Sequence, residues 1–260
     1  MPKNKIKNNT RILLIDIETA PSSGWFFDLW KEGNIVGTIK SWYVLSVAWK
    51  WLGEDKVHCK ALVDYPHYRK NQKNREDDLF LVQDIHALLE EADVVIGHNA
   101  DRFDLRKINS RLLRHGFNPP SPYKTLDTLK VSRRYFAMDS NRLNDVAKYL
   151  GVGSKLPHTG FKLWEDCMKG DPTAWKLMKK YNIQDVALLE RVYMKLRQWS
   201  TSHPNVNLVD MREGACPTCG SKKLQRRGFS VTRTTRIQRF HCQGCGAWSV
   251  GKSEGRLAIR

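Results

Sequence analysis

The stretch RILLIDIET, residues 11–19, decides the fold of this chain. Its aliphatic run from Ile12 to Ile15 is typical of a strand that is buried on both faces in the middle of a sheet. Asp16 and Glu18 follow, and because strand side chains alternate, the two carboxylates share one face about 7 Å apart along the strand. Like charges this close raise each other's pKa unless a cation lies between them. The pattern predicts either a site for a hard divalent metal or a strand end whose polar residues face water.

The length of 260 residues fits one sizeable α/β domain and a small module. We expect a basic tail over 1–10, a main domain over 11–199, a linker over 200–211 and a cysteine-rich module over 212–260. No apolar run approaches the roughly 20 residues that span a bilayer, which argues against a membrane protein. The N-terminus has no apolar segment typical of a secretory signal, so we expect a cytoplasmic or otherwise intracellular protein.

The charge of the chain points to its partners. Its net charge is +17, from 44 Lys and Arg against 27 Asp and Glu. Such an excess favours a polyanion such as nucleic acid, although a generic basic surface is the alternative. Cys59 and Cys167 are isolated, as expected of small buried apolar residues. The other four form two Cys-x-x-Cys pairs, which in an intracellular protein favour metal over disulfides: Cys216, Cys219, Cys242 and Cys245.

The rest of the main domain alternates between strands and helices. Strands over 44–52 and 56–63, joined by a turn, extend the first strand into an antiparallel meander. Later segments alternate between strand and helix patterns, which describes an α/β layer fold with a mixed sheet flanked by helices. The expected strands are 93–97 and 123–127, and the expected helices are 75–91, 105–116, 128–136, 141–150 and 171–199, the last with a break near Tyr181.

Residues 21–43 lack clear periodicity. They predict a long loop or a short helical excursion beside the end of the first strand. Four aromatic residues there either pack against the sheet or stack on unpaired bases: Trp25, Phe26, Phe27 and Trp30.

Two further acidic residues could complete a site with Asp16 and Glu18. Asp104 follows an expected strand and opens a helix, near the carboxyl end of that strand, where open α/β sheets place their ligands. A helix cap is the alternative for Asp104, and Asp101 competes for either role. Asp185 lies four residues after Tyr181, so the two share one face of a helix.

Taken together, these residues resemble a known family. Asp16 and Glu18, the motif Asn99-x-x-x-Phe103-Asp104, and Tyr181-x-x-x-Asp185 resemble the three exonuclease motifs of the DEDD superfamily, which has a ribonuclease H-like fold. Tyr181 in place of a histidine suggests the DEDDy branch. The chain is most similar to the 3′–5′ proofreading domain of family B DNA polymerases, over about residues 10–197. It is too short to carry a polymerase, so the resemblance implies a stand-alone nuclease whose partner in any replication or repair role is unknown.

The resemblance also implies roles and cofactors. Asp16 would bridge two Mg²⁺ or Mn²⁺ ions, Glu18 and Asp185 would hold the ion that activates water, and Asp104 would support the second, partly through water. Two such ions stabilise the attacking and leaving oxygens of a displacement at phosphorus. Tyr181 would orient the water, because a phenol with a pKa near 10 is a poor base at neutral pH. The product would be a nucleoside 5′-monophosphate.

Other roles and functions stay open. Asn99 would position the loop or a nucleotide sugar, or act as a cap, and Lys155 would reach a phosphate. The second motif favours DNA over RNA. The alternatives are an RNA 3′–5′ exonuclease, a non-catalytic nucleic-acid-binding adaptor on the same fold, and a structure-specific endonuclease, which the late Tyr181-x-x-x-Asp185 motif disfavours.

The cysteine pairs predict a second metal site. They are separated by 22 residues, and Gly220 and Gly246 follow them where the chain must turn sharply. Four thiolates at this spacing predict a tetrahedral structural Zn²⁺ site in a module that resembles zinc ribbons.

The segment between the two cysteine pairs is basic and carries no acidic residue. Phe229, Phe240 and Trp248 either form the small core of the module or stack on bases. The charge favours sequence-independent, salt-sensitive binding of nucleic acid. The candidate contacts are Arg226, Arg227, Arg233, Arg236 and Arg239.

Overall fold

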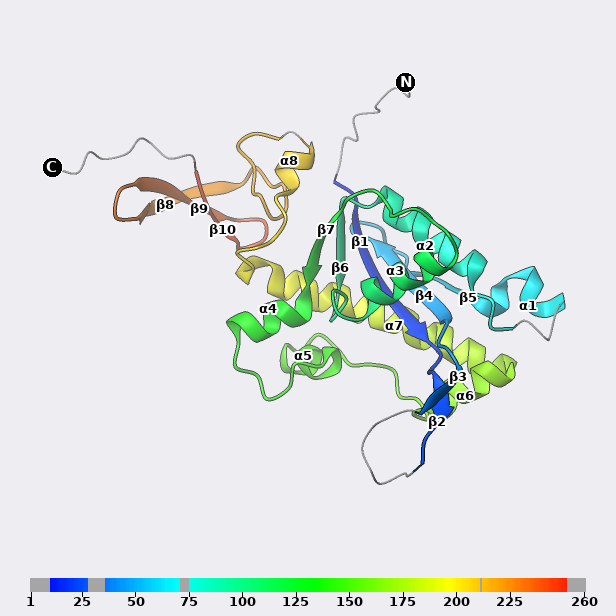
Figure 1. Ribbon diagram of the computed structural model, residues 1–260. Coiled ribbons are helices and arrows are strands. Elements are labelled where there is room, and N and C mark those ends of the chain that lie inside the picture. The colour runs from blue at the N-terminus through cyan, green and yellow to red at the C-terminus, as the bar shows by residue number, and fades with distance from the viewer. Residues whose placement is uncertain (1–9, 28–35, 71–74, 211, 252–260) are drawn as a thin grey trace, which may run out of the picture.

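The computed structural model describes residues 10–27, 36–70, 75–210 and 212–251 (Figure 1). Apart from Thr10, the expected basic tail lies outside them. A five-stranded sheet with helices on both faces forms the main domain, and a separate three-stranded sheet forms the C-terminal part. Within the described ranges, no helix is both long enough and apolar enough to cross a membrane.

The strand β1 (Ile12–Thr19) lies at the centre of the main sheet, whose order is β5-β4-β1-β6-β7. It pairs antiparallel with β4 (Val44–Trp51) and parallel with β6 (Val94–Gly97). The outer strands are β5 (His58–Ala61) and β7 (Lys124–Asp127). The expected antiparallel meander of β1, β4 and β5 and the mixed sheet are therefore confirmed.

The two faces of β1 belong to two apolar clusters. Leu13 and Ile15 are buried in one cluster, and Ile12 and Leu14 are buried in the other. Because strand side chains alternate, Asp16 continues the row of Ile12 and Leu14. The aliphatic half of the strand therefore fixes which way its carboxylates point.

Helices cover both faces of the sheet (Figure 1). On one side lie α2 (Leu79–Glu91) and α3 (Asp104–Arg114). On the other lie α4 (Thr128–Tyr135), α5 (Leu143–Tyr149) and the long α7 (Pro172–Leu196). α7 contacts β1, β4 and β5, so it crosses the antiparallel half of the sheet.

Local sequence explains where α7 begins. The Asp171 carboxylate accepts hydrogen bonds from the backbone N–H groups of Thr173 and Ala174, and Pro172 occupies the first helical position. An aspartate at the N-cap followed by a proline at the first helical position is a sequence pattern typical of a helix start. The expected break near Tyr181 is wrong, because the helix is continuous over its 25 residues and packs on the sheet on both sides of that position.

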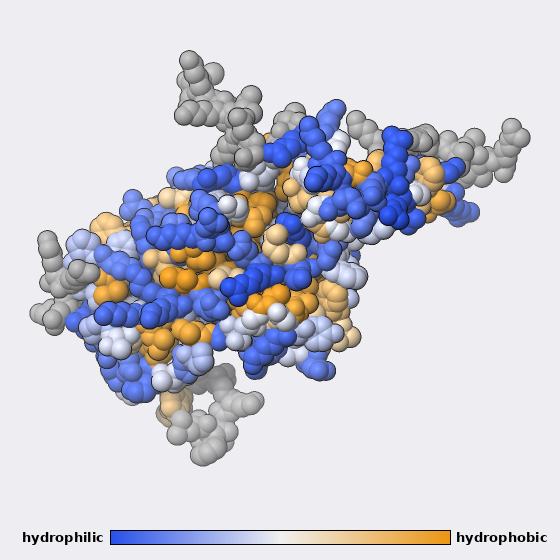
Figure 2. All heavy atoms as spheres, turned by 180° about the vertical axis from the view of Figure 1, so that it is seen from behind, coloured by the Kyte–Doolittle hydropathy of each residue, from blue (hydrophilic) through white to orange (hydrophobic). Residues whose placement is uncertain are grey.

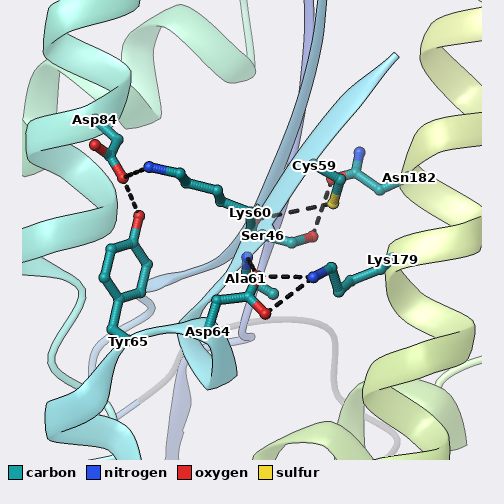
Figure 3. Close-up of polar contacts among 9 residues, drawn as sticks. All are labelled: Ser46, Cys59, Lys60, Ala61, Asp64, Tyr65, Asp84, Lys179 and Asn182. Atoms are coloured by element: carbon teal, nitrogen blue, oxygen red, sulfur yellow. Dashed lines mark hydrogen bonds and ion pairs between the residues drawn. The ribbon is translucent and has the colours of Figure 1, made fainter. Parts of the chain in front are cut away.

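Polar contacts fasten β5 and the following turn between two helices (Figure 3). Lys179 of α7 binds Asp64 at 2.8 Å, in the 3₁₀ turn η1 (Leu62–Asp64). On the other side, Asp84 of α2 accepts a hydrogen bond from Lys60 at 2.6 Å and another from the Tyr65 hydroxyl. These contacts join α2 and α7 through the edge of the sheet.

Several elements differ from expectation. Within residues 21–43, β2 (Ser23–Trp25) and β3 (Gly37–Lys40) form a small antiparallel sheet instead of a loop or helix, and Trp30 lies outside the described residues. The helix expected from residue 75 begins at Leu79. The reason is Asp78, whose buried carboxylate accepts from the Val44 backbone N–H at 2.8 Å and pairs with Arg111.

A helix that the sequence did not indicate, α6 (Lys162–Lys169), packs against α7. Among the residues that the structure describes, the remaining short helices are α1 (Pro66–Lys70), η3 (Arg197–Trp199) and α8 (Val206–Asp210).

Residues 212–251, called the cysteine module below, contain β8 (Leu224–Val231), β9 (Arg236–Cys242) and β10 (Trp248–Val250). These strands form an antiparallel sheet in the order β10-β9-β8. Hydrophilic side chains cover most of the face of the module that Figure 2 shows. The segment before it is tied to both parts, because Val206 donates its N–H to Pro217 and the Tyr193 hydroxyl contacts His203 at 3.0 Å.

Candidate active site

Three carboxylates meet at the carboxyl end of β1. Asp16 and Glu18 come from β1, and Asp185 comes from the middle of α7. One oxygen from each lies within 4.8 Å of the others. Three carboxylates at this spacing match the oxygen ligands that Mg²⁺ and Mn²⁺ prefer.

Burial and mutual repulsion make this cluster reluctant to ionise. Burial raises the pKa of Glu18 to about 8, and the charge of Asp185 adds to that effect. Burial, followed by the charges of Asp104 and Glu18, raises the pKa of Asp16 well above its ordinary value. The pKa of Asp185 is raised by burial, although Lys155 opposes the shift. The cluster therefore favours any cation that replaces its protons.

One atom of Asp185 points to a ligand. Its Oδ1 is buried and has no hydrogen-bond partner among the described residues. A buried carboxylate oxygen without a partner is costly, so such atoms need an explanation such as an ion. The donor set and this orphaned oxygen both fit a divalent metal.

Lys155 lies closer to the carboxylates than the sequence indicated. Its Nζ donates to Asp185 Oδ2 at 2.5 Å and to the Tyr181 hydroxyl at 2.9 Å. The Lys155 side chain is 31 % exposed, whereas that of Asp185 is 1 % exposed. Burial raises the pKa of Tyr181 above its ordinary value, so its phenol stays protonated. The ammonium group supplies positive charge to the cluster in this structure.

Asp104 lies beside the cluster rather than within it. It opens α3, and its Oδ1 accepts from the backbone N–H of Ile17 at 3.0 Å. Its charge still raises the pKa of Asp16, and burial raises its own pKa to about 6. Asp101, its competitor from the sequence, pairs instead with Lys130 at 2.5 Å.

Asn99 adopts a left-handed backbone with φ of 67°, a conformation that asparagine tolerates better than most residues. Its N–H donates to Asp127 Oδ1 at 2.8 Å, and its carbonyl accepts from Phe103. It therefore shapes the loop between β6 and α3. A cavity of about 610 Å³ opens beside it, and its lining includes Asp16, His98, Asn99, Arg133, Arg142, Asn144 and Lys155.

Sequence reasoning missed two neighbours of the carboxylates. Asn182 donates to Asp16 Oδ2 at 2.7 Å and accepts from the Ser46 hydroxyl at 3.0 Å. The signal was present, because Asn182 is a polar residue in the buried stripe of α7 that contains Asp185. Trp164 of α6 lowers the pKa of Glu18 through a hydrogen bond, and its ring packs edge-on against Tyr181. No local pattern identified Trp164.

The four cysteines of the module form a second cluster, with Sγ atoms within 4.8 Å of one another. Cys216 and Cys245 are 3.7 Å apart, as are Cys219 and Cys242. A tetrahedron with Zn–S bonds of about 2.3 Å has edges of about 3.8 Å. The arrangement fits a zinc ribbon.

The local backbone supports this site. Gly220 and Gly246 have φ of 70° and 77°, backbone angles that residues other than glycine rarely adopt. Burial raises the pKa of Cys242, but hydrogen bonds from the backbone N–H groups of Cys245 and Gly244 outweigh it and lower the pKa to about 7. Among the isolated cysteines, Cys167 is buried as predicted and Cys59 is only half-buried.

The three aromatic residues of the module lie outside its buried core, which consists of Cys216, Cys242 and Ala247. Phe229 and Phe240 are half-buried, whereas Trp248 is 55 % exposed. The arginines singled out from the sequence are all exposed: Arg226, Arg227, Arg233, Arg236 and Arg239.

Comparisons with known proteins agree with the fold. A family model described as the RNase_H superfamily matches residues 43–197. Among solved structures, the family B DNA polymerase of the hyperthermophilic archaeon Pyrobaculum calidifontis superposes with a TM-score of 0.50 and 17 % identity. The match covers 86 % of this chain but only 31 % of the polymerase. No curated protein matches significantly. The expected ribonuclease H-like fold and the expected similarity to family B DNA polymerases are confirmed.

Proposed function

Because the chain belongs to the RNase H superfamily, we propose that it is a metal-dependent 3′–5′ exonuclease that releases nucleoside 5′-monophosphates. The observation that supports this most directly is the convergence of Asp16, Glu18 and Asp185 within 4.8 Å. The cavity of about 610 Å³ that Asp16 and Lys155 line is large enough for a nucleotide and adds to it. The similarity of the second motif to polymerase exonucleases favours DNA over RNA.

Asp16, Glu18 and Asp185 would hold Mg²⁺ or Mn²⁺, and Asp104 would support a second ion, partly through water. A pair of such ions supplies an activated water and stabilises the oxygens that enter and leave phosphorus. Asn182 holds the Asp16 carboxylate in place through its 2.7 Å hydrogen bond. This bond fixes the orientation of Asp16, a metal ligand that belongs to β1.

The other polar side chains near the carboxylates can act from the positions that they occupy in this structure. Tyr181 keeps its proton because its pKa is raised, so its hydroxyl can orient the attacking water but cannot act as a base at neutral pH. Lys155 carries its charge next to Tyr181 and Asp185, where it would approach the phosphate of a bound nucleotide. Asn99 shapes the wall of the cavity on the side of α3.

A non-catalytic adaptor is the alternative from another class. The geometry argues against it, because a binding protein gains nothing from holding three repelling carboxylates together in a site that is only partly open to water. Such a cluster destabilises the fold unless ligand binding repays the cost. We further propose that the cysteine module holds one structural Zn²⁺ and binds nucleic acid through its exposed arginines.

The test uses end-labelled single-stranded and duplex DNA and RNA, each with Mg²⁺, Mn²⁺ or EDTA. We expect metal-dependent ladders that shorten from the 3′ end, with DNA cut faster than RNA. Asp16→Asn and Asp185→Asn should each lower the rate on the order of a thousandfold or more. Asp101→Asn is the matched control, because Asp101 lies in the second motif but binds Lys130 outside the cluster. Undiminished cleavage by Asp16→Asn in a folded protein would refute the proposal.

A further inference from the structure

One face of the three-stranded sheet in the cysteine module carries the exposed side chain of Trp248. Trp248 of β10 and Gln225 of β8 both pair with His241 of β9, and Val250 pairs with Arg239. Because strand side chains alternate, these five residues point to the same side, and we call them the tryptophan face. Arg226 pairs with Phe240 and lies on the opposite side.

The tryptophan face forms one wall of a cavity of about 360 Å³. Arg239, Trp248 and Val250 line it from the module, and Thr201 and His203 line it from the segment that follows α7. The volume is in the range of small-ligand sites and accommodates one nucleoside. An exposed indole in a pocket of this size is suited to a flat aromatic ligand.

The charges around the indole favour an anionic ligand. The Arg239 guanidinium lies 5.7 Å from the Trp248 ring centre, and the His241 ring lies 4.8 Å from it. From Arg212 onward the chain has 11 Lys and Arg against two acidic residues. Protein interfaces are depleted in lysine, whereas basic grooves with stacking aromatics are typical of single-stranded nucleic acid binding.

Helix α4 connects this cavity with the one at the carboxylates. Leu129 and Arg133 of α4 line the carboxylate cavity. At the other end of the helix, the Tyr135 hydroxyl contacts Thr201 Oγ1 at 2.6 Å, and Thr201 lines the second cavity. The Phe136 ring packs edge-on against Trp199 beside this contact.

The distance between the two cavities is short. The eight residues of α4 correspond to about 12 Å of helix. Arg133 and Arg134 are exposed along it, although Asp139 also lines the carboxylate cavity. Figure 1 places α4 next to the end of α7 from which the cysteine module continues.

We propose that a single strand whose 3′ end lies at the carboxylates follows α4 and stacks an upstream base on Trp248. Arg239 neutralises a phosphate next to that base. This inference rests on the proposed function, because it assigns the path of the same substrate. It requires an unpaired base, since a base within a duplex offers no free face for stacking.

The test measures binding by the zinc-loaded protein in a buffer without Mg²⁺, Mn²⁺ or a chelator, so that cleavage does not interfere and the cysteine module keeps its zinc. The probes are fluorescent single-stranded DNA of about 3 and about 15 nucleotides, and a blunt duplex of the longer sequence. Trp248→Ala should weaken binding of the long single strand about tenfold and leave the short one unchanged. Trp248→Phe should restore most of the loss, because phenylalanine also stacks.

Arg226→Gln is the matched comparison for Arg239→Gln, because both remove one charge from the same sheet. Arg239→Gln should weaken the long single strand more than the duplex, whereas Arg226→Gln should weaken both to the same small extent. In steady-state cleavage, Trp248→Ala should raise KM for long strands without changing kcat. A strand carrying 5-iodouracil at successive positions should crosslink to Trp248 only from upstream positions.

Equal binding of the long strand by wild type and a folded, zinc-loaded Trp248→Ala would overturn the inference. A loss that is equal for the short strand, the long strand and the duplex would also overturn it. Because binding and crosslinking need no cleavage, they test the path even where the nuclease assay fails. Full cleavage with no effect of Trp248→Ala would remove the path and leave the proposed function intact.

Discussion

The carboxylate cluster and the cysteine cluster are both candidate metal sites, but they are built in opposite ways. The buried apolar core of the cysteine module consists of Cys216, Cys242 and Ala247, so the ligands are themselves most of that core. In contrast, Asp16 belongs to a strand whose neighbours are buried in two large clusters. A metal would therefore fold the module, whereas the fold of the main domain prepares the carboxylate site before any metal binds.

The two sites also differ in access and in charge. Asp16 of the carboxylate cluster lines a cavity of about 610 Å³, and the ammonium of Lys155, which also lines it, already contacts Asp185. The four thiols lie within 4.8 Å of one another, with two pairs at 3.7 Å, so a tetrahedral ion bound by all four would have no open ligand position. Closed sites of this kind are structural, and open ones are catalytic.

The largest effect should follow from removing one thiol. Cys242→Ala should abolish Zn²⁺ binding and unfold the cysteine module, because structural Zn²⁺ contributes about 10 kcal/mol or more to such folds. Metal analysis should find the bound zinc lost, and limited proteolysis should cut within residues 212–251 while the main domain resists. Cys59→Ala is the control, because Cys59 lies on β5 and should leave the zinc content unchanged.

The second prediction concerns pH in the absence of Mg²⁺ and Mn²⁺. The folded protein keeps a proton on Glu18, whose pKa is raised to about 8, while the unfolded chain loses it near the ordinary value of 4.5. The folded state therefore binds more protons between these values, and its free energy of unfolding falls as the pH rises. Thermal melting of the zinc-loaded protein from pH 4.5 to 8, without Mg²⁺, Mn²⁺ or a chelator, should show this fall.

Glu18→Gln should flatten that slope, and saturating Mg²⁺ should largely remove it because metal replaces the proton. Metal affinity should rise by up to about tenfold per pH unit for each proton displaced. If the stability of the wild-type protein changed with pH in the same way as that of Glu18→Gln, this assignment would be contradicted.

A smaller effect is expected at Lys155, whose ammonium competes with a metal ion for Asp185. Lys155→Ala should tighten Mn²⁺ binding a few-fold in calorimetry, since the carboxylates lose a neutralising charge. It should also lower the cleavage rate by removing a cation near the phosphate. Lys162→Ala is the control, because Lys162 pairs with Asp166 on the surface of α6. Weaker Mn²⁺ binding by Lys155→Ala would mean that the ammonium supports the metal site instead.

The smallest effect should come from the start of α7. Asp171→Ala removes the two capping hydrogen bonds and should lower the free energy of unfolding by about 1 kcal/mol. Denaturant titration would measure this loss. The cleavage rate should not change, because Asp185 lies more than three turns further along a helix that the sheet holds. A large fall in rate would show that the carboxylate site is less firmly prepared than the comparison implies.

The parts of the fold that the sequence predicts are those with local patterns. The aliphatic run of β1, the cap at Asp171 and the glycine after α5, Gly151 with φ of 64°, are each readable within a few residues. The two Cys-x-x-Cys pairs are recognisable from their spacing alone. The candidate site could be predicted from the sequence because the order of its motifs along the chain resembles that of a known family.

The remaining features depend on contacts between distant residues. Asp78 looks like part of a helix, but its carboxylate is fixed by Val44 and Arg111, which lie far from it in sequence. Trp164 reaches Glu18 only because α6 packs on α7. Asp104 was expected to hold a metal, and no local pattern indicated that Ile17 would take one of its oxygens.

The continuity of α7 has a consequence for how this chain tolerates insertions. Each added residue turns the following part of a helix by about 100° and advances it by about 1.5 Å. One residue inserted between Tyr181 and Asp185 would therefore swing that carboxylate away from Asp16 and drag the helix end out of register with the sheet. The number of residues along α7 between Tyr181 and Asp185 is therefore fixed by the geometry of the carboxylate site.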